Sequence, residues 1–154
     1  MEIKHVTDLK NAIDIIETQK ASRVSSTLHG FPCTEKGIDL GSFYEHGNRG
    51  VELILEWSGP VSVNDTTPGH LVQYNEFRNG NNLYIVMENN NPNHLKLKSI
   101  TISDYAKTTY LEEMRKNAPR KFLFFKRRVD EKDVDSIIQR LNSYIMKGLY
   151  ISVV

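Results

Sequence analysis

Two glutamates, Glu52 and Glu56, stand where paired carboxylates could transfer protons or bind Mg²⁺. They alternate with apolar residues over 51–57, so both fall on one face of a predicted strand, and Asp65 follows in a loop. A metal-dependent nuclease would also need an acid followed by Glu-x-Lys on an adjacent strand, and we expect no strand of this chain to carry that tripeptide. The simpler interpretation is the solvent face of a one-sided sheet.

The histidines and the single cysteine are the other candidates for catalysis or metal binding. Cys33 with a distant histidine could form a nucleophilic pair, although a lone cysteine is more often a small buried apolar residue. No two of the five histidines stand two or four residues apart, the spacings that bring two imidazoles onto one ion, so we expect no metal and no cofactor. An unrecognised enzyme would need a pocket that gathers some of His29, Cys33, His46, Glu52 and His70.

The most concentrated signal in the sequence is a basic segment over 115–128. It contains seven of the 20 Lys and Arg residues and no acid, which leaves 13 basic residues against 19 acids in the rest of the chain. The seven are Arg115, Lys116, Arg120, Lys121, Lys126, Arg127 and Arg128.

Three interpretations of this basic segment stay open. Its cations could contact a nucleic-acid backbone or another polyanion. The same field would attract an acidic protein partner. It could also be solvated surface, because Arg115 and Lys116 fall in the last turn of a predicted helix, where cations complement the macrodipole.

The predicted strands and loops between 45 and 88 carry acids instead, six of the chain's 19. These six are Glu45, Glu52, Glu56, Asp65, Glu76 and Glu88. Because charge is separated in this way and no catalytic set converges, the leading hypothesis is a small non-enzymatic protein that binds a macromolecular partner. We expect an inhibitor of the immunity or counter-defence type, with Glu52, Glu56, Glu76 and Glu88 contacting a protein partner. The alternatives are a nucleic-acid-binding protein that uses the basic segment and an enzyme of unrecognised type.

Local patterns predict the elements that must position these residues. Thr7 or Asp8 can cap a first helix, and Ser103 or Asp104 can cap a second helix that runs to about Asn117. Strands are predicted over 51–57, 70–77, 83–88 and 95–102, the last with a bulge because its apolar phase slips between 97 and 100. These four strands suggest an antiparallel β-meander.

The C-terminal part predicts a strand, a helix and a strand. Residues 122–125 and 149–154 are apolar without alternation, and a helical stripe lies between them. Asp130 stands at the N-cap position of that helix and Gly148 at its C-cap. The sequence therefore predicts an α+β fold with an N-terminal helix, the meander, a C-terminal βαβ unit, and helices on one face of a mixed sheet.

Length and composition place the chain among ordinary globular proteins. With 154 residues we expect a single domain over 1–154. A single cysteine excludes an internal disulfide, and the first ten residues lack the apolar stretch of a signal peptide. No apolar run approaches the roughly 20 residues that span a bilayer. We therefore expect a soluble cytoplasmic protein without a membrane partner, and its oligomeric state stays open.

Overall fold

The computed structural model describes the chain outside residues 22–29, 36–49, 75–82, 88–92 and 119–127, with only the backbone described over 83–87. The described residues form three helices, a largely antiparallel main sheet and a two-stranded parallel sheet, which confirms the predicted α+β class. In chain order the elements are β1 (Glu2–Thr7), α1 (Leu9–Thr18), β2 (Lys20–Ala21), β3 (Gly30–Glu35), β4 (Val51–Trp57), β5 (Val61–Val63), β6 (Leu71–Gln73), β7 (Leu83–Met87), β8 (Leu95–Ile102), α3 (Asp104–Asn117), α4 (Glu131–Met146) and β9 (Ser152–Val153).

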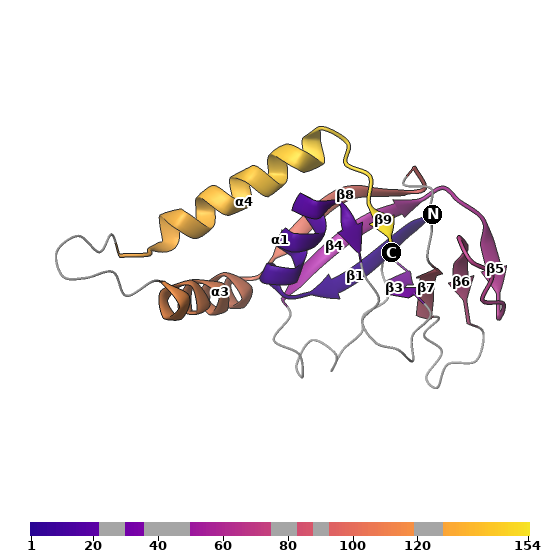
Figure 1. Ribbon diagram of the computed structural model, residues 1–154, viewed down its shortest axis with the longest axis horizontal. Coiled ribbons are helices and arrows are strands. Elements are labelled where there is room, and N and C mark those ends of the chain that lie inside the picture. Colours follow the sequence, from indigo (N-terminus) through magenta and orange to yellow (C-terminus); the bar gives the residue numbers. More distant parts are fainter. Residues whose placement is uncertain (22–29, 36–49, 75–82, 88–92, 119–127) are drawn as a thin grey trace.

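The main sheet has the strand order β5-β6-β7-β3-β1-β4-β8. In this sheet β5 and β6 pair in parallel, and the other five pairs of neighbouring strands are antiparallel. A second sheet pairs β2 with β9 in parallel. Figure 1 shows α1 and α4 over the β1–β4–β8 part of the sheet, while α3 continues beyond the sheet from the end of β8.

The first strand was missed by the sequence patterns, and it changes the predicted order. β1 lies between β3 and β4, so β4 and β6 are not neighbours and the strands do not pair simply in chain order. The face of β1 that the helices cover carries Ile3, His5 and Thr7, and all three are buried. His5 meets its polar requirement by donating from Nδ1 to the carbonyl oxygen of Pro32 at 2.7 Å. Two polar residues on the buried face hid the alternation that marks a strand.

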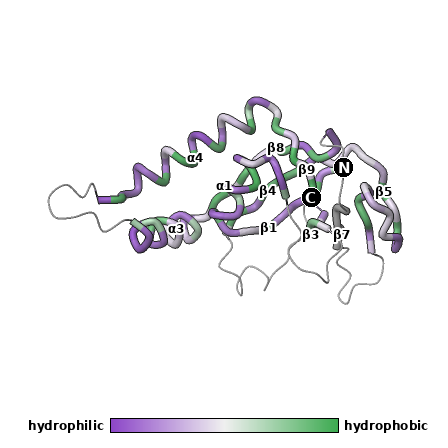
Figure 2. The backbone as a smooth tube through the Cα atoms, viewed as in Figure 1, coloured by the Kyte–Doolittle hydropathy of each residue, from purple (hydrophilic) through white to green (hydrophobic). Residues whose placement is uncertain are grey.

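The central strand β4 follows its predicted pattern. Val51, Leu53, Leu55 and Trp57 are all buried on the face that the helices cover. The predicted bulge in β8 is confirmed, because Ile54 pairs with Ser99 and Leu55 with Leu97, which leaves one residue of β8 without an opposite on β4. This apolar face and the helices enclose one core, which in Figure 2 combines the hydrophobic parts of α1, α4 and the strands.

Short side chains cap the helices where the patterns predicted. Asp8 accepts a hydrogen bond from the backbone N–H of Asn11, and Ser103 accepts one from the backbone N–H of Ala106. Asp130 forms a capping box with Asp133 at the start of α4. Lys147 is the C-cap of α4, and Gly148 follows it with the left-handed φ of +72° that glycine tolerates best.

One predicted burial pattern is wrong, that of residues 149–154. The C-terminal residues alternate, with Leu149, Ile151 and Val153 buried and Tyr150 exposed, because this segment has only one covered face. Its parallel partner is β2, and the predicted partner strand at 122–125 lies outside the described residues. None of the described helices is long and apolar enough to cross a membrane.

Candidate functional site

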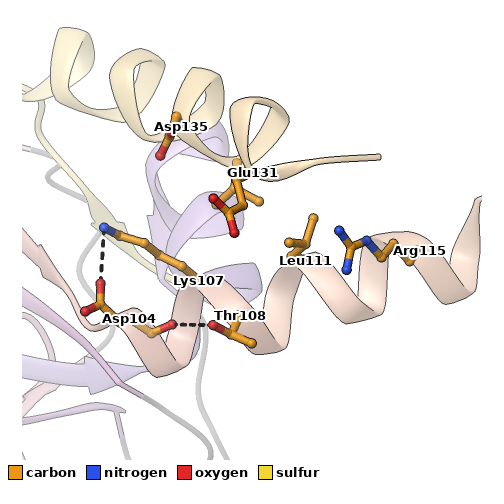
Figure 3. Close-up of a pocket in the computed structure, with 8 residues that line it drawn as sticks. Asp104, Lys107, Thr108, Leu111, Arg115, Glu131 and Asp135 are labelled. Carbon is orange, nitrogen blue, oxygen red and sulfur yellow. Dashed lines mark hydrogen bonds and ion pairs between the residues drawn. The ribbon is translucent and has the colours of Figure 1, made fainter. Parts of the chain in front are cut away.

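A groove of about 430 Å³ lies between α3 and α4. Its walls are the facing sides of the two helices, which Figure 3 shows running past each other with charged side chains projecting into the space between them. Five of the eight residues that line it are charged. The lining residues are Asp104, Lys107, Thr108, Leu111, Arg115, Glu131, Val134 and Asp135.

Helix α1 forms an ion pair with each of the two walls. On one side Lys10 of α1 forms an ion pair of 3.1 Å with Glu113 of α3, and on the other Glu17 of α1 pairs with Arg140 of α4. Tyr110 of α3 lies among these charges, and burial, with Glu113 and Glu17 adding to it, raises the pKa of its phenol. Because α1 contacts both walls and the walls also contact each other, the groove is part of the packing of these three helices.

The floor of the groove is apolar and its walls are charged. Leu111 is 7% exposed and Val134 is 2% exposed, so both belong to the core. Lys107 forms an ion pair of 3.6 Å with Asp104 on its own helix. Arg115 donates from Nε to the carbonyl oxygen of Val129 at 3.1 Å, and in Figure 3 its guanidinium extends back along α3 towards Leu111.

The α4 wall carries two acids that no described cation neutralises. Glu131 and Asp135 stand four residues apart on the side of α4 that lines the groove, and neither is in a salt bridge with a described residue. Like charges at this spacing destabilise a helix by about 0.2–0.5 kcal/mol. The α4 wall therefore presents a negative surface to whatever occupies the groove, and Arg115 presents a positive one at its outer end.

A second groove of about 340 Å³ lies between the start of α1 and α3. Its charges are used internally, because Asp8 caps α1 and Lys10 is paired with Glu113. It therefore offers a partner less unsatisfied charge than the groove between α3 and α4.

The structure places Glu52 and Glu56 on the sheet face away from the helices, each beside a lysine. Glu52 lies 3.6 Å from the ammonium of Lys4, and Glu56 lies 3.2 Å from that of Lys98. Glu76 and Glu88, the other two predicted contacts with a protein partner, lie outside the described residues, as does Glu45. The two described acids of the predicted partner surface are thus partly neutralised by neighbouring lysines.

The expectation that no strand carries Glu-x-Lys is wrong, because residues 2–7 form a strand. Glu2 and Lys4 lie on β1 next to β4, with Glu2 directly opposite Glu56. However, Lys4 is 8% exposed and lies beside Glu52, so its ammonium is covered and paired. A lysine that assists phosphodiester cleavage must reach the scissile phosphate, and we therefore regard this pair as structural.

The basic segment is described at its two ends. Arg115 lines the groove, Lys116 is exposed in the last turn of α3, and Arg128 is exposed before α4. The other four of its cations, Arg120, Lys121, Lys126 and Arg127, lie outside the described residues.

The residues named for an enzyme do not converge where they are described. Cys33 of β3 lies on the helix-covered face of the sheet, since the β1–β3 register puts it on the same side as Ile3, whereas Glu52 points to the other face. His70 shares a hydrogen bond of 2.9 Å with the hydroxyl of Ser62 at the β5–β6 edge. His29 and His46 lie outside the described residues.

Metal ligands do not gather in the described part of the chain. Across that part, no group of three or more His, Cys, Asp or Glu side chains has an arrangement that could hold a metal ion. His5 and His94 lie beside aromatic rings, those of Phe31 and Trp57 respectively.

Cys33 should be chemically silent in the folded protein. The thiol is 2% exposed, and burial raises its pKa well above the ordinary value, so little reactive thiolate exists near neutral pH. We expect iodoacetamide at pH 8 to alkylate the folded protein at least about a hundredfold more slowly than the urea-unfolded chain, because reaction requires opening of the core. Mass spectrometry of timed samples measures both rates; equal rates would show that Cys33 is accessible.

Sequence patterns did not reveal the groove. Glu131 and Asp135 were visible only as acids near the start of a helix, and Lys107 and Leu111 as members of another helix. The one usable signal is that Glu131 and Asp135 share a face at a repulsive spacing. Comparison of the chain with protein-family models, with curated proteins and with solved structures found no match.

Proposed function

We propose that this is a non-enzymatic cytoplasmic protein that binds a protein partner, as inhibitors of the immunity or counter-defence type do, and that the α3–α4 groove is where the partner docks. One observation carries the proposal. An apolar floor of Leu111 and Val134 lies under charged walls, and the two acids of the α4 wall form no ion pair with a described residue. Apolar contact supplies affinity in such a surface, and complementary charge supplies register and selectivity.

The make-up of the groove favours a macromolecular segment over a small metabolite. Small-molecule pockets are mostly apolar, with a few placed polar groups. Here five of the eight lining residues are charged, and two of the remaining three are the apolar floor residues. A mixed-charge rim around a small apolar centre is the composition of a protein interface.

Loss of a groove charge should weaken retention of the partner. The test captures tagged protein from its native cell extract after nuclease treatment, comparing wild type with a double variant, Arg115→Gln with Asp135→Asn. We expect the double variant to retain at least about tenfold less partner at equal load, because two complementary charges are lost. Quantitative mass spectrometry of the eluates measures the ratio.

The matched control removes one charge of each sign from α3, at positions outside the groove. Lys116→Gln and Glu112→Gln change exposed residues of α3 that do not line the groove, and the control should retain the partner like wild type. Equal retention by the groove double variant would disprove docking in this groove. If capture without nuclease treatment recovers nucleic acid but no protein, the result would instead favour a nucleic-acid-binding function for the basic segment.

A further inference from the structure

We infer that the occupant of the α3–α4 groove is an amphipathic helix of the protein partner, which presents a pair of basic side chains to α4 and an acidic side chain to Arg115. This inference rests on the proposed function, because it specifies what the partner inserts. It follows from the kind of walls, from the order of their charges and from the position of the apolar floor.

The walls favour a helix over an extended strand. Both walls are helices, whose mid-helix backbone N–H and C=O groups are already paired within each helix. An extended segment would lose backbone hydrogen bonds to water on docking and find no replacement there. A helix brings its backbone bonds with it and packs its side chains between those of α3 and α4, as in other helix-in-groove complexes.

The charge order determines which side chains the partner must carry. From the sheet end outward, Figure 3 shows Asp135 and then Glu131 on α4, and then Arg115 on α3. The other two charges of the groove, Lys107 and Asp104 on α3, are paired with each other. Because the two acids stand one helical turn apart, basic residues at i and i+4 of a partner helix would face them. An acidic residue one or two turns further out would then face Arg115.

Arg115 is suited to receive a carboxylate. Its Nε donates to the carbonyl oxygen of Val129, which holds the side chain in place, and Arg115 as a residue is exposed. A guanidinium positioned in this way binds a carboxylate with directional hydrogen bonds. Between the charges, Leu111 and Val134 leave room for an apolar side chain of the same helix.

The test uses synthetic amphipathic helices of about 15 residues, a length at which isolated helices begin to form. The matched peptide carries Lys, Lys and Glu in the predicted order beside a leucine stripe, and the inverted peptide carries Glu, Glu and Lys. Isothermal titration calorimetry at low salt should show that wild type binds the matched peptide at least about tenfold more tightly. Equal affinities, or no binding of either peptide, would overturn the inference.

Charge variants test the assignment of the walls. Glu131→Lys with Asp135→Lys and Arg115→Glu should reverse the preference between the peptides. Because that variant changes three charges and can lose its fold, the neutral pair Glu131→Gln with Asp135→Asn is measured beside it and should abolish the preference. The control Lys116→Gln with Glu112→Gln should keep it; a preference that survives the neutral pair would contradict the inference.

The outcomes separate this inference from the proposed function. If the groove variant loses the cellular partner but the peptides bind equally, the groove docks a partner and the helix assignment is wrong. If the groove variant keeps the partner, the proposed function itself is wrong. Sedimentation of the protein alone tests whether a second copy of the chain occupies the groove. If the protein forms a dimer and the neutral pair Glu131→Gln with Asp135→Asn dissociates it, the inference is overturned.

Discussion

Replacing Gly50 with alanine is expected to lower the free energy of unfolding by about 2–3 kcal/mol, through two separate effects. Gly50 has a φ of +61°, in the left-handed region that costs an L-residue about 1–2 kcal/mol. A Cβ there would also fall within 2.4 Å of the Ser103 hydroxyl oxygen. That hydroxyl caps α3, and loss of such a cap costs about 1 kcal/mol.

Urea unfolding followed by fluorescence of the sole tryptophan, Trp57, measures this loss, since Trp57 is buried in the core. Gly148→Ala is the matched control, because its φ is +72° but its nearest neighbour is the flexible side chain of Lys96 at 3.4 Å. It should lose only the backbone contribution. Ser103→Ala in the Gly50→Ala background should relieve the clash, so the double variant should lose less than the sum of the single losses.

Replacing Leu141 with alanine is the second change with a large expected effect. Leu141 is completely buried where α4 packs into the core, and truncation of such a leucine costs about 2–5 kcal/mol through lost burial and the cavity that remains. The same unfolding experiment measures it. Against a total stability of about 5–15 kcal/mol, this is a large fraction.

Asn142→Ala is the control for Leu141, because it changes the adjacent exposed residue of the same helix. It should alter the free energy of unfolding by less than about 0.5 kcal/mol. A loss at Leu141 below about 1 kcal/mol would mean that α4 is not anchored in the core as described. The acidic wall of the groove would then have no fixed position relative to α3.

Both changes act on the walls of the groove. Gly50 and Ser103 set where α3 begins, directly after the edge strand β8. Leu141 anchors the C-terminal half of α4, while Glu131 and Asp135 lie at its other end. The distance between the walls therefore depends on interactions at both ends of the helix pair.

Local sequence determined the elements whose causes are local. The alternation over 51–57 predicted β4 with its buried face, because a strand turns successive side chains to opposite sides. Asp8, Ser103 and Asp130 predicted helix starts, because their side-chain oxygens can accept from backbone N–H groups a few residues ahead. Gly148 predicted the end of α4, because glycine tolerates the left-handed φ of +72° that follows the last residue of the helix.

Long-range pairing decided what local patterns could not. β1 was missed because its buried face includes His5 and Thr7, whose burial is possible only once β3 and β4 enclose them. In the sequence Glu52 and Glu56 have no lysine next to them, but in the structure lysines from neighbouring strands lie beside them. Pairing partners so distant in sequence leave no periodic trace.

By itself, then, the sequence determined the α+β class, the helix boundaries and the burial pattern of β4, because propensity, capping and periodicity act over a few residues. Tertiary structure alone decided the strand order and the groove. Residues 104–115 and 131–135 face each other because α3 and α4 pack against each other and α1 forms an ion pair with each. The unneutralised charge of Glu131 and Asp135 is a property of that packing, and so is any partner it selects.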